Sequence, residues 1–384
     1  METQKHLFDI PEDVTYLNAA NMSPLLNSTN AIGKLGIDQK SHPFTIKGED
    51  FFKPLQELKT LFGQLIDTSE TQRIAGIPSV SYGIATVTNN IVLNSGDEIL
   101  VIEDQFPSNI YSWKRLAEKY NAFIKVVKKP SEEGNCGNLW NEIILDQISD
   151  KTAVITMGNI HWADGTIFDL KAISLKAKTL NSLLIIDGSQ SIGALPFSIK
   201  EIQPDALICA GYKWLLGAYS FGLAYYGPYF DNGIPIEENW SNRLDSENFA
   251  GLTNYETQYK PLANRYNVGE SANFIAVPML LDSIKYIIKW KPINIQVYCH
   301  SISKHVMEPL RDLGCVIEEN QYRAKHLFGI KLPSHTDLNK LKTTFEENKI
   351  FIANRGQYIR ISCHLFNTKK DFDTLFKALE SVLN

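Results

Sequence analysis

The sequence has little of what marks a membrane, secreted or nucleic-acid-binding protein. No apolar run in its 384 residues approaches the length that crosses a bilayer. The first residues lack the basic-then-apolar order of a secretory signal. Its 38 lysines and arginines are scattered among 43 acidic residues, and the net charge of -5 gives no electrostatic footprint for a nucleic acid. We therefore expect a soluble cytoplasmic protein that binds neither membranes nor nucleic acids.

Cysteine is also scarce, and histidine is not grouped. The five cysteines form no CxxC pair, and an odd, dispersed set is typical of reduced thiols in a cytoplasm. The eight histidines include no HxxxH pair on an obvious helix. We expect neither a disulfide framework nor a metal site.

The middle of the chain alternates apolar runs of strand length with helix-like stretches. Uninterrupted apolar runs predict buried strands, and the helix-like stretches between them predict crossover connections. This pattern predicts an α/β fold with a mostly parallel sheet that is covered on both faces. The predicted strands are Glu98–Ile102, Ala122–Val127, Ala153–Met157, Leu183–Ile186, Ala206–Ala210 and Phe221–Tyr226, and the predicted helices include Ser108–Tyr120 and Leu170–Leu180.

After about residue 255 the pattern changes to that of an α+β domain. Two long helix-like stretches, Ala276–Lys289 and Ile293–Leu313, precede short predicted strands near residues 326–332, 350–353 and 358–362. A final amphipathic helix is predicted at 371–383. The first twenty-odd residues carry no sheet pattern of their own. We predict a large domain at 25–255 and a small domain made of 1–24 and 256–384.

Two charged residues follow buried strands in the large domain. Asp187 follows the strand at 183–186, and Lys213 follows the strand at 206–210. Ligands of open parallel sheets bind beyond the carboxyl ends of the strands, so both side chains are expected at one crevice. Taken singly, Asp187 reads as a helix N-cap and Lys213 as a solvated loop lysine.

Taken together with Gln190, Asp187 and Lys213 fit a pyridoxal phosphate (PLP) site. PLP needs a lysine amine that holds it as a Schiff base and a carboxylate that keeps its pyridine nitrogen protonated. Gln190, three residues after Asp187, is placed to donate to the phenolic oxygen of the ring.

Four segments carry a resemblance to a known family: IIDGSQSIGALPFSI, DALICAGYKWLLG, RYNVGESANF and IRISCHLFNTKKDFD. They resemble the class V aminotransferases of PLP fold type I, which include cysteine desulfurases, kynureninase and isopenicillin N epimerase-like proteins. The resemblance spans nearly the whole chain. It implies a seven-stranded, mostly parallel sheet between helices, with a small α+β C-terminal domain. It also implies that Lys213 carries the cofactor and that Asp187 binds the ring nitrogen.

The resemblance extends to the cofactor phosphate. Ser79, Val80 and Ser81 precede or begin a helix-like stretch, where backbone amides and a hydroxyl would cradle a phosphate. Simple helix capping is an alternative role that is compatible with this one. Tyr212 is a further candidate for the phosphate.

Two aromatic residues are expected around the cofactor ring. Phe106 occupies the place where family members put an aromatic ring over the cofactor, which is histidine in desulfurases and phenylalanine in kynureninases. A core phenylalanine is the alternative. Trp162 stands where many relatives have asparagine, which suggests a hydrophobic wall in place of a hydrogen bond. His161 beside it is either a proton-transfer group or a structural histidine.

A third region is expected to act across a subunit boundary. Gly269, Glu270 and Ser271 lie in the segment that, in relatives, reaches the phosphate of the neighbouring subunit. The resemblance therefore implies a homodimer with shared active sites, and Trp240 is expected near the same entrance. Loop packing is the alternative for all of these residues.

Two arginines are candidates for the carboxylate of an amino-acid substrate, because a guanidinium binds a carboxylate through two parallel hydrogen bonds. Arg360 matches the kynureninase-like pattern, and Arg355 matches the position used in cysteine desulfurases. We place Arg360 first.

The reaction is predicted less sharply than the cofactor. The stretch from 320 to 355 has no cysteine, and Cys363 lies on a predicted strand, so a desulfurase persulfide is disfavoured. We expect an aminotransferase-like enzyme acting on an amino acid or amine. The alternatives are a kynureninase-, selenocysteine lyase- or isopenicillin N epimerase-like enzyme, and a catalytically silent PLP-fold binding protein. Neither GxGxxG nor GxxxxGK[ST] occurs, which argues against a nucleotide binder.

Overall fold

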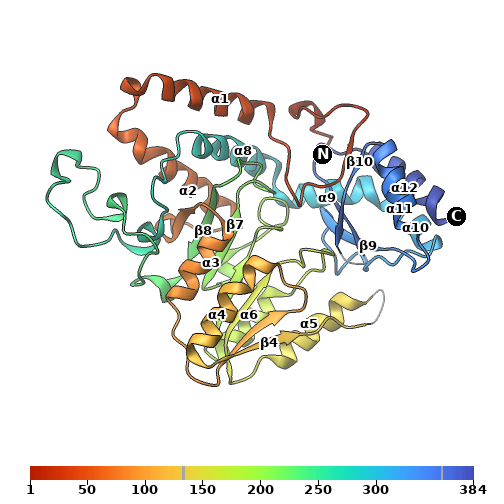
Figure 1. Cartoon of the computed structure of the whole chain (residues 1–384), viewed down its shortest axis with the longest axis horizontal. Helices are drawn as coiled ribbons and strands as arrows, with labels where there is room; N and C mark the ends of the chain where they lie inside the picture. The colour runs from red at the N-terminus through yellow and green to blue at the C-terminus, as the bar shows by residue number, and fades with distance from the viewer. Residues whose placement is uncertain (132–134, 356–357) are drawn as a thin grey trace.

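A computed structural model describes residues 1–131, 135–355 and 358–384, and a seven-stranded sheet forms its centre (Figure 1). The strand order is β2-β8-β7-β6-β5-β3-β4. Neighbours from β7 to β4 run parallel, while β8 is antiparallel to both β2 and β7. The mostly parallel sheet predicted from the sequence is confirmed. The strands are β2 (Ile74–Ile77), β3 (Glu98–Ile102), β4 (Phe123–Val127), β5 (Thr152–Gly158), β6 (Leu183–Asp187), β7 (Ala206–Ala210) and β8 (Gly222–Tyr226).

Each face of this sheet packs against its own hydrophobic core. Side chains alternate between the faces of a strand, so Ile99 and Val101 of β3 belong to one core, whereas Leu100 and Ile102 belong to the other. Both sets are buried, which explains why the strands lack polar alternation. The sheet helices are α2 (Lys53–Leu65), α3 (Val80–Asn89), α4 (Tyr111–Tyr120), α5 (Cys136–Gln147), α6 (Leu170–Thr179), α7 (Ile199–Ile202) and α8 (Ala276–Trp290).

A second unit, here called the small unit, lies at the right of Figure 1 and contains both chain termini. It holds an antiparallel sheet in the order β11-β12-β9 and the parallel pair β1-β10. Thr15 of β1 pairs with Ile350 of β10, so the N-terminal residues complete this unit. Its elements are β1 (Thr15–Tyr16), β9 (Leu327–Lys331), β10 (Ile350–Phe351), β11 (Ala353–Arg355), β12 (Tyr358–Ser362), α9 (Pro292–Ser303), α10 (Met307–Asp312), α11 (Leu338–Glu347) and α12 (Lys369–Leu383).

Two predictions about the elements need correction. The stretch predicted as one helix from 293 to 313 is broken into α9, the 3-10 turn η10 (Lys304–Val306) and α10. Pro309 has no N–H to give to the carbonyl four residues earlier, and its ring disfavours a helix through that turn. Strand β2 was not predicted, because four residues that include a glycine give too short a signal.

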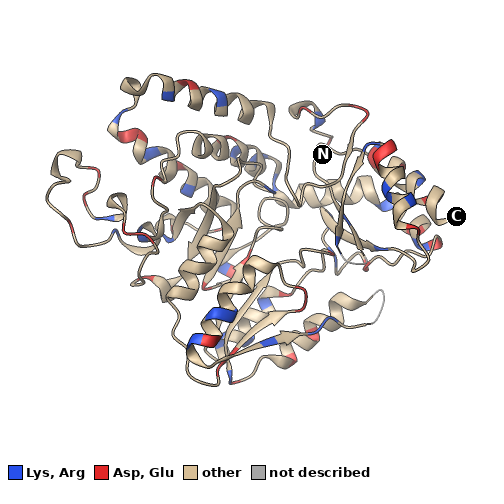
Figure 2. Cartoon of the chain, in the orientation of Figure 1, with Lys and Arg blue, Asp and Glu red and all other residues tan. Residues whose placement is uncertain are grey.

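The domain boundaries remain a prediction. Helix α8 lies in the part assigned to the small domain, and it packs against α2 and against α1 (Asn27–Ser41). In residues 1–131, 135–355 and 358–384, no helix is long and apolar enough to cross a membrane. Figure 2 shows basic and acidic residues interspersed along the chain.

Candidate active site

A cavity of about 250 Å³ lies beyond the carboxyl ends of β5, β6 and β7. It is the place that the sequence predicted for Asp187 and Lys213, and both residues line it. Most of the residues predicted to bind the cofactor are brought together here. Those that line the cavity are Ser79, Val80, Ser81, Phe106, Trp162, Asp187, Gln190, Tyr212 and Lys213.

Asp187 is the last residue of β6, which carries its carboxylate to the edge of the sheet. Its Oδ1 accepts a hydrogen bond from the backbone N–H of Ser189 at 3.0 Å. That bond fixes the carboxylate in an Asx turn, and no helix begins here, because the next one along the chain is α7, so the N-cap alternative for Asp187 is wrong. The described residues give Oδ2 no hydrogen-bond donor, so it remains available to a ligand in the cavity.

Lys213 follows β7 and is only 8% exposed, although no described carboxylate lies within ion-pair distance of its amine. Burial lowers the pKa of Lys213 to about 8, and the positive charges of Arg360 and Arg355 act in the same direction. The negative charge of Asp187 opposes this shift. A lysine of lowered pKa has a larger neutral fraction near pH 7, and the neutral amine is the nucleophile and base.

The amide of Gln190 is held by two hydrogen bonds. Nε2 donates to the carbonyl of Ala20 at 3.1 Å, and Oε1 accepts from the indole Nε1 of Trp214 at 3.0 Å. Trp214 is fully buried beside Lys213 in the sequence. One N–H of Gln190 is thus free of these bonds, and its contact with the phenolic oxygen of the cofactor stays a prediction.

The N-terminus of α3 opens onto the cavity. Ser79 is the N-cap, and its Oγ accepts the N–H of Tyr82 at 3.2 Å, so the predicted capping role is present. The N–H groups of Val80 and Ser81, at the first turn, have no backbone acceptor within the helix. No acidic residue occupies that turn. The dipole and the free N–H groups therefore favour an anion at this position.

Phe106 and Trp162 form an aromatic wall of the cavity. Their rings meet edge to face, with centroids 5.3 Å apart. The indole Nε1 of Trp162 donates to the carbonyl of Asp104 at 2.6 Å, and Asp104 adopts a left-handed conformation that aspartate tolerates. The amine of Lys213 lies 5.6 Å from the ring centroid of Phe106. Trp162 thus lines the cavity, and its role as a hydrophobic wall beside the cofactor stays a prediction.

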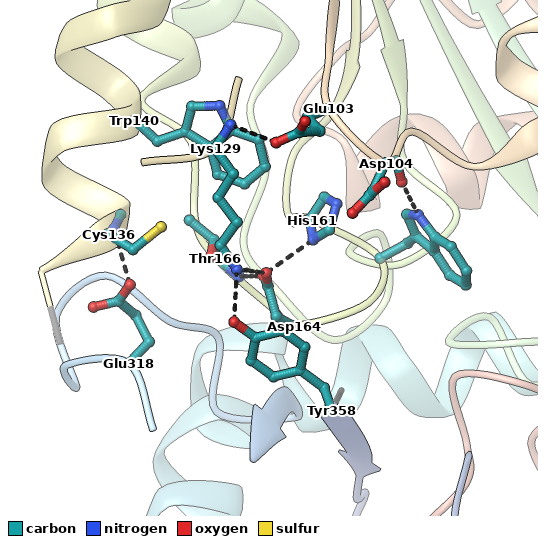
Figure 3. Close-up of polar contacts among 12 residues, drawn as sticks. Glu103, Asp104, Lys129, Cys136, Trp140, His161, Asp164, Thr166, Glu318 and Tyr358 are labelled. Atoms are coloured by element: carbon teal, nitrogen blue, oxygen red, sulfur yellow. Dashed lines mark hydrogen bonds and ion pairs between the residues drawn. The ribbon is translucent and has the colours of Figure 1, made fainter. Parts of the chain in front are cut away.

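Lys129 connects the segment that follows Trp162 with strand β12 through polar contacts (Figure 3). It follows β4, and its Nζ contacts Oδ2 of Asp164 at 2.5 Å and the hydroxyl of Tyr358 at 3.3 Å. Asp164 lies two residues after Trp162, and Tyr358 lies on β12 two residues before Arg360. Burial by itself lowers the pKa of Lys129, but the carboxylate of Asp164 outweighs it and holds that pKa above its ordinary value.

His161 belongs to this ion-pair cluster and not to the described lining of the cavity. It is buried, its ring lies 5.2 Å from that of Trp140, and its Nδ1 is 3.1 Å from Oδ2 of Asp164. Burial raises the pKa of Asp164, but His161 and Lys129 outweigh it and hold that pKa well below its usual range. This placement favours the structural role for His161.

Arg360 and Arg355 lie near Trp162, with guanidinium carbons 5.9 and 5.3 Å from its ring centroid, but outside the described lining. Arg360 is 1% exposed, and its Nη1 donates to the carbonyl of Trp162 at 3.0 Å. Its Nε and Nη2 are buried without a partner. Burial lowers the pKa of Arg360 to about 9, with Arg355 adding to the effect. Arg355 is less buried and donates to the carbonyl of Asn354 at 2.7 Å.

Glu270 and Ser271 lie in a different hollow, together with Trp240. The N–H of Gly269 donates to Glu237 at 2.6 Å, and Glu270 has a left-handed backbone. These residues lie away from Lys213 of the same chain. They could therefore contribute only to the active site of a partner subunit. That contribution stays a prediction.

Sequence reasoning missed the segment from Tyr219 to Gly222, which also lines the cavity. Its last residue, Gly222, begins β8, whose antiparallel direction brings its amino end to the edge where parallel strands have their carboxyl ends. A search limited to the residues after the carboxyl end of each strand cannot find it. The ring of Tyr219 lies 4.5 Å from that of Tyr212.

The cavity fits the predicted cofactor. It combines a carboxylate with a free oxygen, a lysine amine without an acidic partner, and the unpaired N–H groups of a helix N-terminus. Nε2 of Gln105, another lining residue, is buried without a hydrogen-bond partner. The carboxylate suits the pyridine nitrogen of PLP, the amine suits its aldehyde, and the N–H groups of the helix N-terminus suit its phosphate. Within the described parts of the chain, no group of histidine, cysteine and acidic residues is arranged to hold a metal ion.

Comparison with known proteins gives a consistent result. The model of the class-V aminotransferase family matches residues 45–375. A probable cysteine desulfurase of Methanothermobacter thermautotrophicus is 29% identical over 86% of this chain and 84% of its own. An uncharacterized aminotransferase of Bacillus subtilis is 23% identical over 81% of this chain and 79% of its own.

Solved structures share the fold over nearly the full length. The cystine C–S lyase C-DES, in complex with cysteine persulfide, superposes with a TM-score of 0.86 at 17% identity, covering 97% of this chain and 98% of that one. A variant of C-DES has glycine covalently linked to PLP, with a TM-score of 0.87 at 17% identity over 99% of both chains. At these identities the likeness establishes the fold alone.

Proposed function

The chain belongs to the class-V aminotransferase family, whose cofactor is PLP, and from that premise we propose that it acts on the α-carbon of an amino acid through the amine of Lys213. One observation carries the proposal. A buried amine of lowered pKa and a carboxylate with a free oxygen share one cavity with a helix N-terminus. These are the three groups that hold PLP at its aldehyde, ring nitrogen and phosphate.

Each group then has one task. Bound in this cavity, PLP supplies an electron sink for the charge left on the substrate α-carbon. Asp187 stabilises the positive charge on the ring nitrogen, and the N–H groups of Val80 and Ser81 bind the phosphate. The amine of Lys213 takes the proton from the α-carbon. Trp162 and Phe106 form an apolar wall beside the reacting atoms.

We propose aminotransferase-like chemistry first, because the cavity offers one mobile base. Among the described lining residues, Lys213 is the only amine, and no imidazole is present. The other titratable groups are Asp187, Tyr212 and Tyr219, and burial raises the pKa of Tyr212. A single base that removes a proton and returns it on the same face suits transamination. Epimerisation needs a second acid on the opposite face.

A β-lyase acting on a sulfur-containing amino acid is the second candidate, because relatives of 22–29% identity are named cysteine desulfurases. All five cysteines are buried, and none lines the described cavity. We therefore propose no sulfur transfer to an enzyme thiol. Sulfur released by such a reaction would leave on a small molecule.

The substrate carboxylate is proposed to bind Arg360. Its Nε and Nη2 have no partner among the described residues, and it borders the wall formed by Trp162. Arg360→Met should raise the KM for an amino acid at least tenfold, because a charged bidentate hydrogen bond is lost. Arg355→Met should change it less. The reverse ranking would transfer the role to Arg355.

A panel of amino acids tests the reaction itself. The PLP-loaded protein is incubated with each amino acid, with and without a 2-oxo acid acceptor. Aminotransferase chemistry yields a new amino acid only when the acceptor is present. Lyase chemistry yields ammonia and pyruvate without an acceptor, together with sulfide when the substrate is cysteine or cysteine persulfide when it is cystine. Neither product, in a protein that binds PLP through Lys213, would refute the enzymatic proposal and favour a silent binding protein.

A further inference from the structure

Arg323 is a buried arginine that lacks an acidic partner. It is 2% exposed and lies in the small unit, between α10 and β9. The chain shows how a buried arginine is otherwise accommodated. Arg73 is 9% exposed, and its guanidinium contacts the carboxylates of Glu70 and Asp231. No described carboxylate lies within 4 Å of the guanidinium of Arg323. Taking such a charge out of water is costly unless an anion accompanies it.

The described neighbours of Arg323 form no ion pair with it. Nη1 has one long contact, 3.5 Å to the carbonyl of Ala324, and the guanidinium carbon lies 4.7 Å from the ring centroid of Phe328. Nε is buried without a partner, and Nη2 donates to no described residue. Burial lowers the pKa of Arg323 to about 10, with the nearby charge of Arg311 adding to the effect, and the opposing influence of Cys363 and Glu318 does not outweigh it. Arg360 shows the same pattern at the wall of the active site.

Arg323 lines a hollow on the surface of the small unit, with a volume of about 690 Å³. The charges around it do not balance. The lining has three cations, Lys304, Arg311 and Arg323, against two carboxylates, because Glu308 pairs with Arg311 and Glu319 forms no described ion pair. Lys304 and Arg323 have no acidic partner among the described residues. The lining residues are His300, Lys304, Met307, Glu308, Arg311, Ile317, Glu319, Asn320, Gln321 and Arg323.

Other groups report the same excess of positive charge. Burial lowers the pKa of His300, and the charges of Lys325, Arg323 and Lys304 lower it further. The Nδ1 atom of His300 is buried without a partner. A neutral imidazole can donate one hydrogen bond without adding charge. The hollow therefore offers fixed cations and an unused hydrogen-bonding ring.

We propose that this hollow binds a small oxyanion, a phosphate or a dicarboxylate, which pairs with Arg323 and Lys304. Phosphate and carboxylate share the chemistry that a guanidinium recognises, namely adjacent oxygens that accept two parallel N–H groups. The site is separate from the cavity at Lys213 and does not depend on the proposed reaction. It nevertheless adjoins that cavity's wall, because Ala324 N donates to Gly165 O and Ile167 N donates to Tyr322 O, just after Trp162.

The test compares thermal unfolding of the PLP-loaded protein in chloride, inorganic phosphate and malonate at equal ionic strength. PLP occupies the N-terminus of α3 throughout, so added phosphate does not report on that site. We expect phosphate, malonate or both to raise the Tm of the wild type, and the two anions identify which chemistry is preferred. Arg323→Met should lose this response. Arg115→Met removes an exposed arginine and is the matched control.

The same variant separates a ligand site from a structural role. In chloride alone, Arg323→Met should have a higher Tm than the wild type, because an uncompensated buried charge has been removed. A lower Tm by the same amount in all three salts would overturn the proposal. So would a response that survives in Arg323→Met and disappears in Arg360→Met, which would place the anion at the active site.

A second variant covers the case in which Arg323→Met does not fold. Lys304 is exposed at the rim, so Lys304→Met should leave the fold intact. The dissociation constant of the anion, from a titration of the Tm or of heat, should rise about tenfold, as expected for losing one charged hydrogen bond. An unchanged constant, or the absence of any anion-specific effect in the wild type, refutes the site.

Discussion

The lowered pKa of Lys213 predicts how fast the apoprotein takes up PLP at different pH values. The neutral amine attacks the cofactor aldehyde, so the uptake rate should follow the neutral fraction of Lys213. With a pKa of about 8, roughly 9% of the amine is neutral at pH 7. An ordinary lysine has about 0.03% neutral amine at that pH. Uptake should therefore be roughly 300-fold faster at pH 7 than an unshifted lysine allows, and it should level off above pH 8.

The assay follows the yellow absorbance of lysine-bound PLP after mixing apoprotein and cofactor between pH 6 and 11. Nα-acetyllysine, whose side-chain amine is free, is mixed with PLP in the same buffers and corrects for titration of the cofactor itself. Borohydride treatment and peptide mass mapping should place the product on Lys213. The Lys213→Ala variant should give no stable yellow product.

Two variants test the physical cause of the shift. Asp187 raises the pKa of Lys213, so Asp187→Asn should move the midpoint of the uptake profile to lower pH. Arg360 lowers that pKa, so Arg360→Met should move the midpoint to higher pH. A wild-type midpoint near pH 10.5 would refute the reasoning. Movement of both variants in the same direction would also refute it, since it would show that charge does not set the shift.

Two further predictions concern residues away from the cofactor. Tyr358→Phe removes only the hydroxyl that contacts Lys129. We expect the KM for the amino acid to rise about two- to fivefold, with kcat and the cofactor absorbance unchanged. Tyr229→Phe is the exposed control, and an equal rise of KM in that variant would refute a positioning role for Tyr358. Lys59 is fully buried, and burial lowers its pKa to about 7. Between about pH 7 and 10.5 the unfolded state therefore binds more protons than the folded state does. The free energy of unfolding should rise with pH across that range. Lys59→Met should flatten this rise and stabilise the protein at pH 7 by up to roughly 4 kcal/mol, less about 1 kcal/mol because Asn264 loses its hydrogen-bond donor. Chemical denaturation at several pH values measures the free energy of unfolding and its dependence on pH. A pH dependence in Lys59→Met equal to that of the wild type would contradict this prediction.

The sequence predicts best those parts of the fold that rest on uninterrupted patterns. Strands β3 and β7 have the predicted bounds, because every residue in them but the first of β3 is buried and apolar. The break between α9 and α10 depends on one proline inside an otherwise helical pattern, which apolar spacing does not reveal. Strand β2 depends on pairing with β8, a contact between residues far apart in the chain.

The candidate site divides in the same way. Asp187, Lys213 and Trp162 could be placed together because each follows a parallel strand, and topology brings such residues to one edge. The segment from Tyr219 to Gly222 could not, because it lies at the amino end of an antiparallel strand. The uncompensated charge of Arg323 is invisible in sequence, since nothing there distinguishes an arginine without an acid from Arg73, which has two.

The pairing of β1 with β10 has a consequence for how the chain is made. Thr15 is synthesised before the whole of the large sheet, whereas its partner Ile350 is synthesised after it. Leu17 and Phe8, both buried in the finished protein, therefore lack their contacts with the later part of the small unit while the large sheet is being synthesised. The large sheet can form during that time, whereas the small unit closes only after β10 has been synthesised. A nascent chain that stalls late would carry a folded sheet and a loose, apolar N-terminal strand, which is the segment that chaperones are expected to hold.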